Sequence, residues 1–213
     1  MPSRSGNLDL DPALVAAARA GEAAAFEAIV RRLQVPLLRY VRRSLPRHEA
    51  EDVTQDAFVQ AYLHLPKYDP RWAFKTWVFV IARRLTIDRL RRLRRRPTRP
   101  MPGVEPAAAE STDGLAAAES AGRLWDAARR TLSDDAFQAL WLFYVDDLAA
   151  ADIAVVLGRS WAWVRMSLHR SRAKLRGVLA EAESERVRAA ERPRQVLVPS
   201  PGTPGGVADS RAG

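Results

Sequence analysis

The densest group of charged side chains in this chain is a run of arginines near its middle. Residues 83–99 contain nine arginines and one acid, so this segment carries a charge of +8, against +9 for all 213 residues. Guanidinium groups bind phosphate oxygens. An ordinary run of charged residues is less dense than this one and usually forms only the solvated face of a helix. A run this dense therefore predicts contact with a nucleic acid or another polyanion, with an affinity that falls as salt rises.

No grouping of residues predicts catalysis. The chain has no cysteine and three widely separated histidines, which leaves no thiolate or histidine set for a metal. Adjacent acids at 51–52, 134–135 and 146–147 lie at expected helix starts or on polar faces, where capping and solvation account for them. We therefore expect no catalytic residue, no cofactor and no metal.

The sequence also bears on location. Residues 1–11 are polar and lack an apolar signal core, and the longest apolar run covers residues 139–145. A membrane span needs about 20 apolar residues, so no membrane insertion is expected. The absence of cysteine fits a reducing compartment, and we expect a cytoplasmic, nucleoid-associated protein.

Helical periodicity in both halves predicts the elements that position these residues. We expect an all-α fold of two small helical domains joined by a flexible linker, the C-terminal domain containing a helix-turn-helix. The predicted divisions are a disordered N-terminus at 1–11, a helical domain at 12–96, a linker at 97–118, a helical domain at 119–183 and a disordered tail at 184–213. The linker and the tail are predicted from their proline and glycine content.

A helix predicted over 47–65 has two distinct faces. Its apolar face is expected to enter the core and comprises Ala50, Val53, Ala57, Phe58, Ala61, Tyr62 and Leu65. Its other face is acidic and polar. The next helix begins near Phe74 and continues into the arginine run, and the spacing of Phe74, Trp77, Val78 and Ile81 favours core packing over base stacking.

The second domain is predicted to hold four helices, at 124–131, 134–145, 149–157 and 160–183. Gly158 and Arg159 join the last two, because glycine readily adopts the left-handed conformation that ends a helix. A short helix, a glycine turn and a long basic helix are typical of a helix-turn-helix. On the last helix, Val164, Leu168, Ser171 and Leu175 share the face expected to pack inward.

Two ordered motifs in residues 49–97 carry a family resemblance. The first reads E-D-V-T-Q-D-A-F from Glu51, and the second reads F-K-T-W-V-F-V-I-A-R-R-L-T-I-D-R-L-R-R from Phe74. This segment resembles the core-binding and promoter-melting domain of the extracytoplasmic-function (ECF) subfamily of sigma-70 RNA polymerase sigma factors. The second domain is similar to the same family's C-terminal domain, and the resemblance covers residues 12–179.

The resemblance implies a promoter-recognition subunit that directs core RNA polymerase to promoters and assists their opening, without being an enzyme. The implied partners are core polymerase, through its β′ coiled coil and β flap, promoter DNA, and an anti-sigma factor. The residues implied to bind core polymerase are Asp52, Gln55, Asp56 and Gln60. Those implied to bind the −10 element are Tyr68, Asp69, Arg71, Trp72, Arg83, Arg84, Thr86, Arg89 and Arg92.

The residues implied to contact the −35 element in the major groove are Ser160, Trp161, Ala162, Arg165, Met166, His169, Arg170 and Arg172. This helix departs from the family pattern at Trp161, Trp163 and Met166, where relatives usually have small or polar residues. Two alternatives remain open from the sequence. One is a sigma-like regulator that binds polymerase or DNA without initiating transcription, and the other is a helical interaction module whose arginines bind RNA or membrane phosphates.

Overall fold

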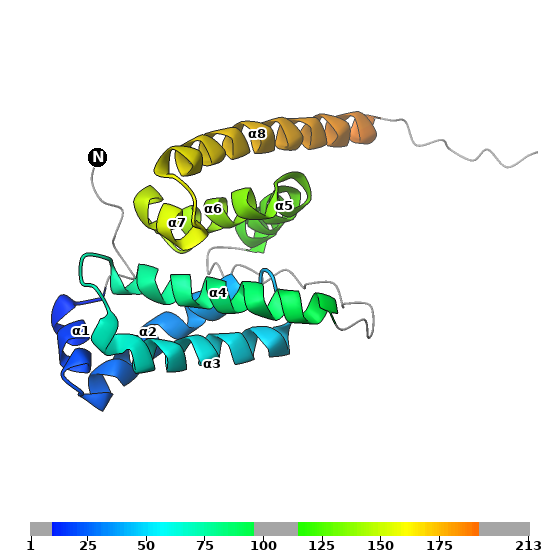
Figure 1. Ribbon diagram of the computed structural model, residues 1–213. Coiled ribbons are helices and arrows are strands. Elements are labelled where there is room, and N and C mark those ends of the chain that lie inside the picture. The colour runs from blue at the N-terminus through cyan, green and yellow to red at the C-terminus, as the bar shows by residue number, and fades with distance from the viewer. Residues whose placement is uncertain (1–9, 96–114, 192–213) are drawn as a thin grey trace, which may run out of the picture. The chain divides into compact units, whose positions relative to one another are not determined.

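The computed structural model describes residues 10–95 and 115–191. Within these ranges the chain is helical and contains no strand (Figure 1), which confirms the predicted all-α class. The N-terminal helices are α1 (Pro12–Arg19), α2 (Ala23–Val41), α3 (Arg47–His64), the 3-10 turn η1 (Leu65–Lys67) and α4 (Phe74–Arg95). The C-terminal helices are α5 (Leu115–Thr131), α6 (Asp134–Tyr144), α7 (Ala150–Leu157) and α8 (Trp161–Glu191).

Most helices begin and end within a few residues of their predicted bounds, but two are longer. Helix α5 begins at Leu115, inside the predicted linker, and α8 continues to Glu191, beyond the predicted end at 183. Both extensions consist largely of alanine, glutamate and arginine, which are strong helix formers. The predicted disorder or flexibility of residues 1–9, 96–114 and 192–213 falls outside the described residues.

The start of α1, the end of α7 and the buried face of α8 each follow from residues within that element or next to it. The Asp11 side chain accepts a hydrogen bond of 2.8 Å from the Ala13 amide and caps α1, with Pro12 at the first helical position. Gly158 ends α7 with φ of +61°, in the left-handed region that glycine occupies without steric cost. On α8 the four residues predicted to face inward are all buried, which confirms that face of the helix-turn-helix.

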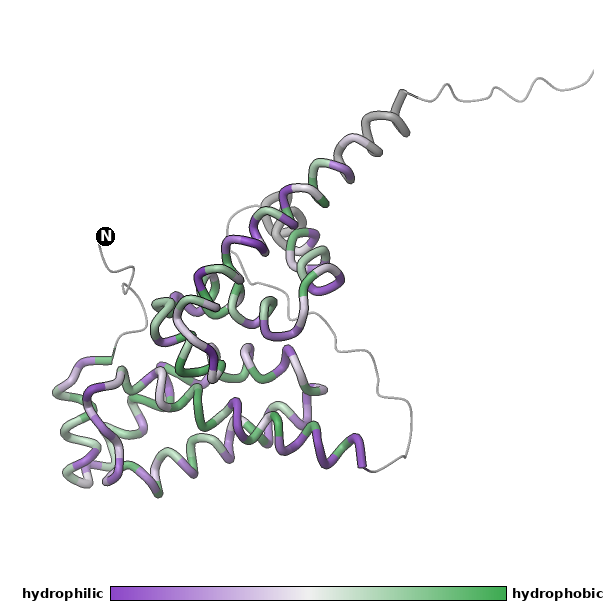
Figure 2. Tube along the Cα trace, turned by 45° about the horizontal axis from the view of Figure 1, so that its top comes forward, coloured by the Kyte–Doolittle hydropathy of each residue, from purple (hydrophilic) through white to green (hydrophobic). Residues whose placement is uncertain are grey.

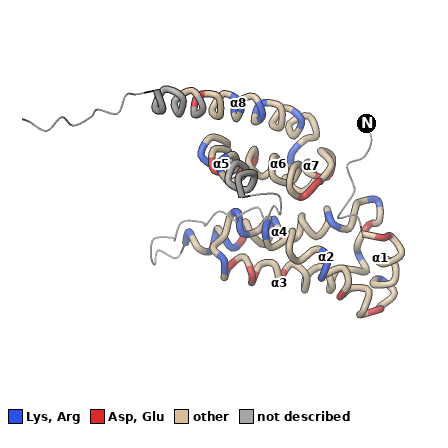
Figure 3. Tube along the Cα trace, turned by 180° about the vertical axis from the view of Figure 1, so that it is seen from behind, with Lys and Arg blue, Asp and Glu red and all other residues tan. Residues whose placement is uncertain are grey.

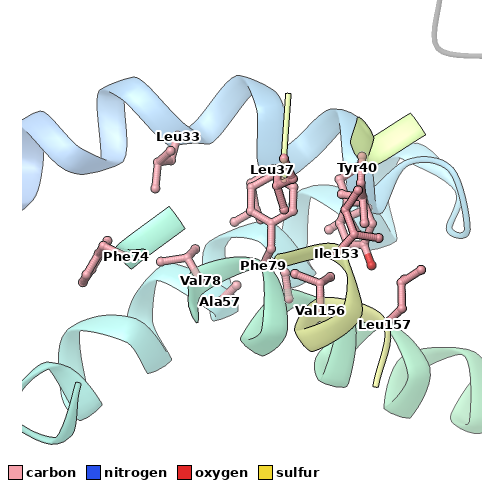
Figure 4. Close-up of a cluster of buried hydrophobic side chains, with 14 of the residues drawn as sticks. Leu33, Leu37, Tyr40, Ala57, Phe74, Val78, Phe79, Ile153, Val156 and Leu157 are labelled. Atoms are coloured by element: carbon pink, nitrogen blue, oxygen red, sulfur yellow. The ribbon is translucent and has the colours of Figure 1, made fainter. Parts of the chain in front are cut away.

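The described residues divide into two units after Leu179, and the second unit contains the C-terminal part of α8. In the first unit, hydrophobic residues recur along α2, α3 and α4 (green in Figure 2), and many of them belong to one buried apolar cluster. Phe79 of α4 is fully buried, with the Tyr40 ring 5.2 Å from its own. The buried face of α7, with Ile153, Val156 and Leu157, belongs to the same apolar cluster (Figure 4).

A charged cluster is buried beside these apolar side chains. The Asp146 side chain, in the loop between α6 and α7, is fully buried, and the residue contacts cations of two helices. Arg39 of α2 donates to its Oδ1 at 3.3 Å, and the Lys75 ammonium of α4 donates to its backbone carbonyl. Burial raises the pKa of the Asp146 carboxyl from its ordinary value near 3.8 to about 6, against the opposing effects of Arg39, Lys75 and Arg43.

This raised pKa predicts a pH-dependent stability. Because the folded chain holds the Asp146 proton more tightly than the unfolded chain, folding takes up a proton between the two pKa values. Lowering the pH from 7.5 to 5.0 is therefore expected to raise the free energy of unfolding by about 1 kcal/mol relative to Asp146→Asn, which does not titrate. Urea unfolding of both proteins at each pH measures this difference, and parallel pH curves would contradict it.

Candidate protein and nucleic-acid interfaces

A groove of about 660 Å³ lies between α2 and α3. We call it the α2/α3 groove, and its lining residues are Phe26, Val30, Gln34, Val35, Leu38, Glu51, Thr54, Gln55, Phe58, Val59, Tyr62 and Leu63. Its wall is mostly apolar yet open to solvent, since Val35 is 60% exposed and Leu63 is 62% exposed. Scattered exposed apolar side chains are ordinary, but a contiguous group of them marks an interaction surface.

One residue of this wall corrects a prediction. Tyr62 was expected in the core, whereas it is 52% exposed. Its ring meets Phe26 of α2 edge-on, with a centroid separation of 5.0 Å. Helix α3 packs against α2 on one side and α4 on another, so the side chains at the edge of its apolar stripe form the groove instead of the core.

The acidic and amide side chains predicted to bind polymerase lie along the same helix. Gln55 and Asp56 are exposed, Gln60 is half-buried, and Gln55 also lines the groove. Asp52 is exposed as well, but it accepts a hydrogen bond of 3.0 Å from Arg89 of α4. The apolar groove and a polar rim therefore occur together on α3, an arrangement typical of protein interfaces.

The loop between η1 and α4 is internally braced. Tyr68, predicted to bind DNA, is buried against Phe74 and Trp77, with ring centroids 5.0 and 5.2 Å away. Its environment is that of a core residue supporting the loop. Phe74 is buried and Trp77 is half-buried in this aromatic group, as their helical spacing predicts.

Asp69, Arg71 and Trp72 form the outer part of the loop. The Asp69 carboxylate accepts hydrogen bonds from the Arg71 amide at 3.0 Å and from its Nε at 2.7 Å, and these bonds lower the pKa of Asp69. Trp72 is 46% exposed. A crevice of about 480 Å³ separates the loop from α1, and Arg19 of α1 lines it. Arg19 could not be predicted as part of this site, because nothing in the sequence places α1 beside this loop.

The predicted DNA-binding residues of α4 fall into two groups. Arg84 and Arg92 are exposed, in the basic part of the helix (blue in Figure 3). The other three are engaged within the chain. Thr86 is buried and donates to the Ala82 carbonyl at 2.8 Å, and Arg89 pairs with Glu49 and Asp52 of α3. Arg83 donates to Gln138 of α6 at 2.8 Å.

The residues predicted to meet the −35 element form one exposed surface on α8. All eight are solvent-exposed, and the Ser160 hydroxyl accepts a hydrogen bond of 3.1 Å from the Trp163 amide at the start of the helix. Trp161 is 52% exposed, and the Arg165 guanidinium lies 4.8 Å from the centre of its ring. Arg172 donates to the Tyr144 hydroxyl at 2.7 Å. The surface combines basic and aromatic groups, which can contact phosphates and base edges.

No described helix is both long and apolar enough to cross a membrane. Across 10–95 and 115–191, histidines and acids nowhere gather in a set of three able to hold a metal ion.

Comparison with known proteins identifies related chains. The sigma-70 region 2 family matches residues 29–96. The ECF RNA polymerase sigma factor SigC of Mycobacterium tuberculosis is 31% identical over 175 residues, which cover 81% of this chain and 91% of SigC. SigW of Bacillus subtilis is 29% identical over 147 residues, covering 63% of this chain and 77% of SigW.

Solved structures agree with these sequence matches. The structure of CnrH in complex with the cytosolic domain of CnrY is similar with a TM-score of 0.56 and 26% identity, covering 79% of this chain and 96% of CnrH. RpoE of Bartonella quintana, solved with the anti-sigma factor NepR, has the same fold, with a TM-score of 0.55 and 23% identity over 73% of this chain and 96% of RpoE. By its match to SigC and to the sigma-70 region 2 family, this chain belongs to the ECF subfamily of RNA polymerase sigma factors.

Proposed function

We propose that this sigma factor, which directs core RNA polymerase to promoters, binds the β′ coiled coil through the α2/α3 groove and the acidic face of α3. The observation that carries this proposal is the joint exposure of an apolar groove and of Gln55 and Asp56 on one helix. Burial of apolar area in the interface supplies binding affinity. Carboxylates opposite basic residues of a partner fix its orientation and raise the rate of association. Asp52 and Gln60 extend this polar face at either side.

We further propose that the loop at 68–72 and helix α4 hold the opened −10 element. Trp72 offers an exposed ring for stacking an unpaired base, and the crevice beside it provides room between the loop and α1. Arg84 and Arg92 are free to meet phosphates, as is Arg19 across the crevice. Tyr68, Asp69 and Arg71 shape the loop, and Thr86 and Arg89 hold α4 in place from within.

The exposed surface of α8 is proposed to read the −35 element. Arg165 and Arg170 are candidates for bidentate contact with guanine, His169 and Ser160 for other base edges, and Arg172 for backbone. Trp161, Ala162 and Met166 provide apolar contacts, such as to thymine methyl groups. The C-terminal helices are also proposed to contact the β flap.

Three further assignments belong to the same proposal. The chain acts by binding and carries no catalytic activity of its own, and it works in the cytoplasm at the nucleoid.

An anti-sigma factor is proposed as a partner, because RpoE of Bartonella quintana was solved with one. The exposed Trp161 ring and the neighbouring Met166 provide apolar surface for such a contact. Inhibition by a cognate anti-sigma factor should weaken in Trp161→Ala.

Reconstituted transcription tests the proposal. Purified chain, sigma-free bacterial core polymerase and fragmented genomic DNA are combined, and the 5′ ends of the transcripts are mapped. Discrete starts that share an upstream sequence are the expected result. In the double variant Trp72→Ala/Arg84→Ala, transcription from these starts should fall by about 10- to 100-fold, because base stacking and a phosphate contact are both lost.

The matched control is Arg32→Ala, which removes one exposed arginine on α2 and should leave transcription unchanged. Binding of polymerase without discrete starts would argue against promoter recognition by this chain. An unaffected Trp72→Ala/Arg84→Ala variant would leave promoter recognition standing and remove the assignment of these two residues.

A further inference from the structure

A polar cavity of about 380 Å³ is lined by residues of α4, α5 and α6 and of the turn that follows α2. Four arginines contribute to its wall, and we call it the arginine pocket. Arg43 comes from the turn after α2, Arg83 and Arg94 come from α4, and Arg129 comes from α5. The volume lies within the range of cavities that hold small molecules in proteins.

Arg43 is the most deeply buried of the four arginines. It is only 7% exposed, and its guanidinium lies against the ring of Trp141. In the described part of the chain Arg43 forms no ion pair, and the buried acid near it, Asp146, pairs with Arg39 at 3.3 Å. The Nε of Arg43 is a buried donor without a hydrogen-bond partner in the protein. Such a donor opposes folding, so its presence in the wall of a pocket indicates a bound acceptor.

A second guanidinium lies close to Arg43. The guanidinium carbons of Arg43 and Arg129 lie 5.0 and 5.2 Å from the centre of the Phe137 ring, and Arg129 donates to the Arg43 carbonyl at 3.3 Å. Burial, and next the charge of Arg129, lower the pKa of the Arg43 guanidinium to about 8, against the opposing effect of Asp146. Because the two neighbouring cations repel each other, an anion bound between them would be favoured.

The two acids of the pocket do not neutralise these cations. Asp135 accepts hydrogen bonds from Arg83 at 3.3 Å and from Arg159 at 2.5 Å, so its charge is already shared by two other arginines. Asp134 is exposed at the start of α6. The three remaining arginines therefore face one exposed acid, which leaves the pocket positively charged.

The chemistry of the wall suits linked phosphate groups. Guanidinium groups bind phosphate oxygens through pairs of hydrogen bonds. Here they reach the pocket from three parts of the chain, so two linked phosphates can meet more of them than one phosphate can. The Ser44 hydroxyl accepts a hydrogen bond of 3.5 Å from the Gln138 amide, which leaves its own proton to donate to a phosphate oxygen.

Part of the pocket wall is apolar. Ile87 and Leu90 of α4 and the Phe137 ring of α6 line it beside the arginines. Pockets that bind small organic molecules commonly combine apolar surface with a few polar groups that fix orientation. The base or ribose of a nucleotide could therefore be in contact with protein while its phosphates meet the guanidiniums.

We propose that the arginine pocket binds a small molecule that carries a diphosphate group, with Arg43 and Arg129 holding one phosphate and Arg94 the other. The diphosphate can belong to a nucleoside diphosphate or be inorganic pyrophosphate. The proposal goes beyond promoter recognition and does not depend on it, since Trp72 and Arg84 do not line this pocket.

Calorimetric titration of the full chain tests the proposal and distinguishes the two sources. The probes are inorganic pyrophosphate, ADP and GDP, with orthophosphate and AMP as single-phosphate counterparts, at about 150 mM salt to screen weak surface attraction. One diphosphate probe should bind per chain, about tenfold or more tightly than its single-phosphate counterpart. Tighter binding of ADP or GDP than of pyrophosphate would assign the nucleotide, and the reverse order would assign pyrophosphate. Absence of saturable binding, or equal affinity for one and two phosphates, would overturn the proposal.

Substitutions locate the bound probe. Arg129→Gln should weaken diphosphate binding by about tenfold or more, because a charge-assisted contact is lost. Arg130→Gln is the matched control, since it removes the same charge from an exposed neighbour on α5 that does not line the pocket, and its affinity should stay within about twofold. Arg94→Gln, at an exposed position near the end of α4, should weaken binding about three- to tenfold without disturbing the core. Equal effects of the pocket variants and Arg130→Gln, in chains that circular dichroism shows to be helical, would overturn the proposal.

Arginine Nε–H signals in nuclear magnetic resonance spectra report on Arg43 in the unaltered chain. The Arg43 signal is assigned as the one that Arg43→Lys removes, and the Arg130 signal in the same way. On addition of pyrophosphate the Arg43 signal should shift and saturate with the calorimetric affinity, because its unpartnered Nε gains an acceptor. The Arg130 signal should stay in place. An Arg43 signal that does not move while pyrophosphate binds would place the ligand elsewhere and overturn the proposal.

Discussion

Replacing Val35 and Val59 together by aspartate is expected to weaken binding to core polymerase by about 100-fold. Both side chains line the α2/α3 groove, where Val35 is 60% and Val59 50% exposed. In the free chain the new carboxylates remain in water, so the fold should be retained. In the complex they would be buried against the apolar surface of the partner that fills the groove, which costs several kcal/mol. Fluorescence titration of labelled chain with core polymerase measures the change.

Ala24→Asp provides the control for this prediction. Ala24 is an exposed residue of α2, outside the groove, and aspartate there adds the same type of charge. Its affinity for polymerase should stay within about twofold of the parent chain, as expected for a substitution outside the binding surface. Full affinity in Val35→Asp/Val59→Asp would show that the polymerase binds elsewhere.

Replacing Phe79 by alanine is expected to cause a large decrease in the free energy of unfolding. Phe79 is fully buried, packs its ring on Tyr40, and belongs to the cluster that joins α2 and α4 to the buried face of α7. Phe79→Ala removes most of that side chain and leaves a cavity, so we expect a decrease of about 3–5 kcal/mol in the free energy of unfolding. Urea denaturation followed by circular dichroism measures it.

Two variants calibrate this result. Phe79→Leu keeps much of the apolar volume and should cost less than half as much as alanine. Trp72→Ala removes a larger ring from an exposed position, and its effect should lie within about 0.5 kcal/mol. If Phe79→Ala cost no more than Trp72→Ala, the close packing around Phe79 would be refuted.

Local features of the fold could be predicted because their physical causes are local. Asp11 and Pro12 begin α1 by capping and by a preset dihedral angle, and Gly158 ends α7 because it adopts a positive φ without a clash. The inward face of α8 follows from the 3.6-residue period of its apolar side chains. Each of these depends on residues within one or two turns of one another.

The groove could be predicted only in part. The sequence identifies the polar face of α3, because acids and amides recur there at helical spacing. It cannot show that Tyr62, at the edge of the apolar stripe, faces water. That depends on where α2 and α4 approach α3, which is decided by packing between helices distant in sequence.

The sequence by itself determined the helical class, the helix-turn-helix, the basic character of α4 and the sigma-factor motifs. All of these can be read from amino-acid composition, from the helical periodicity of apolar residues and from the spacing of residues close together in the chain. Only the tertiary structure decided that Tyr68 supports its loop from the core, that Arg19 shares a crevice with Trp72, and that Arg83 is engaged by Gln138. Such contacts join residues far apart in the chain, and their geometry arises from the packing of whole helices, which no local pattern encodes.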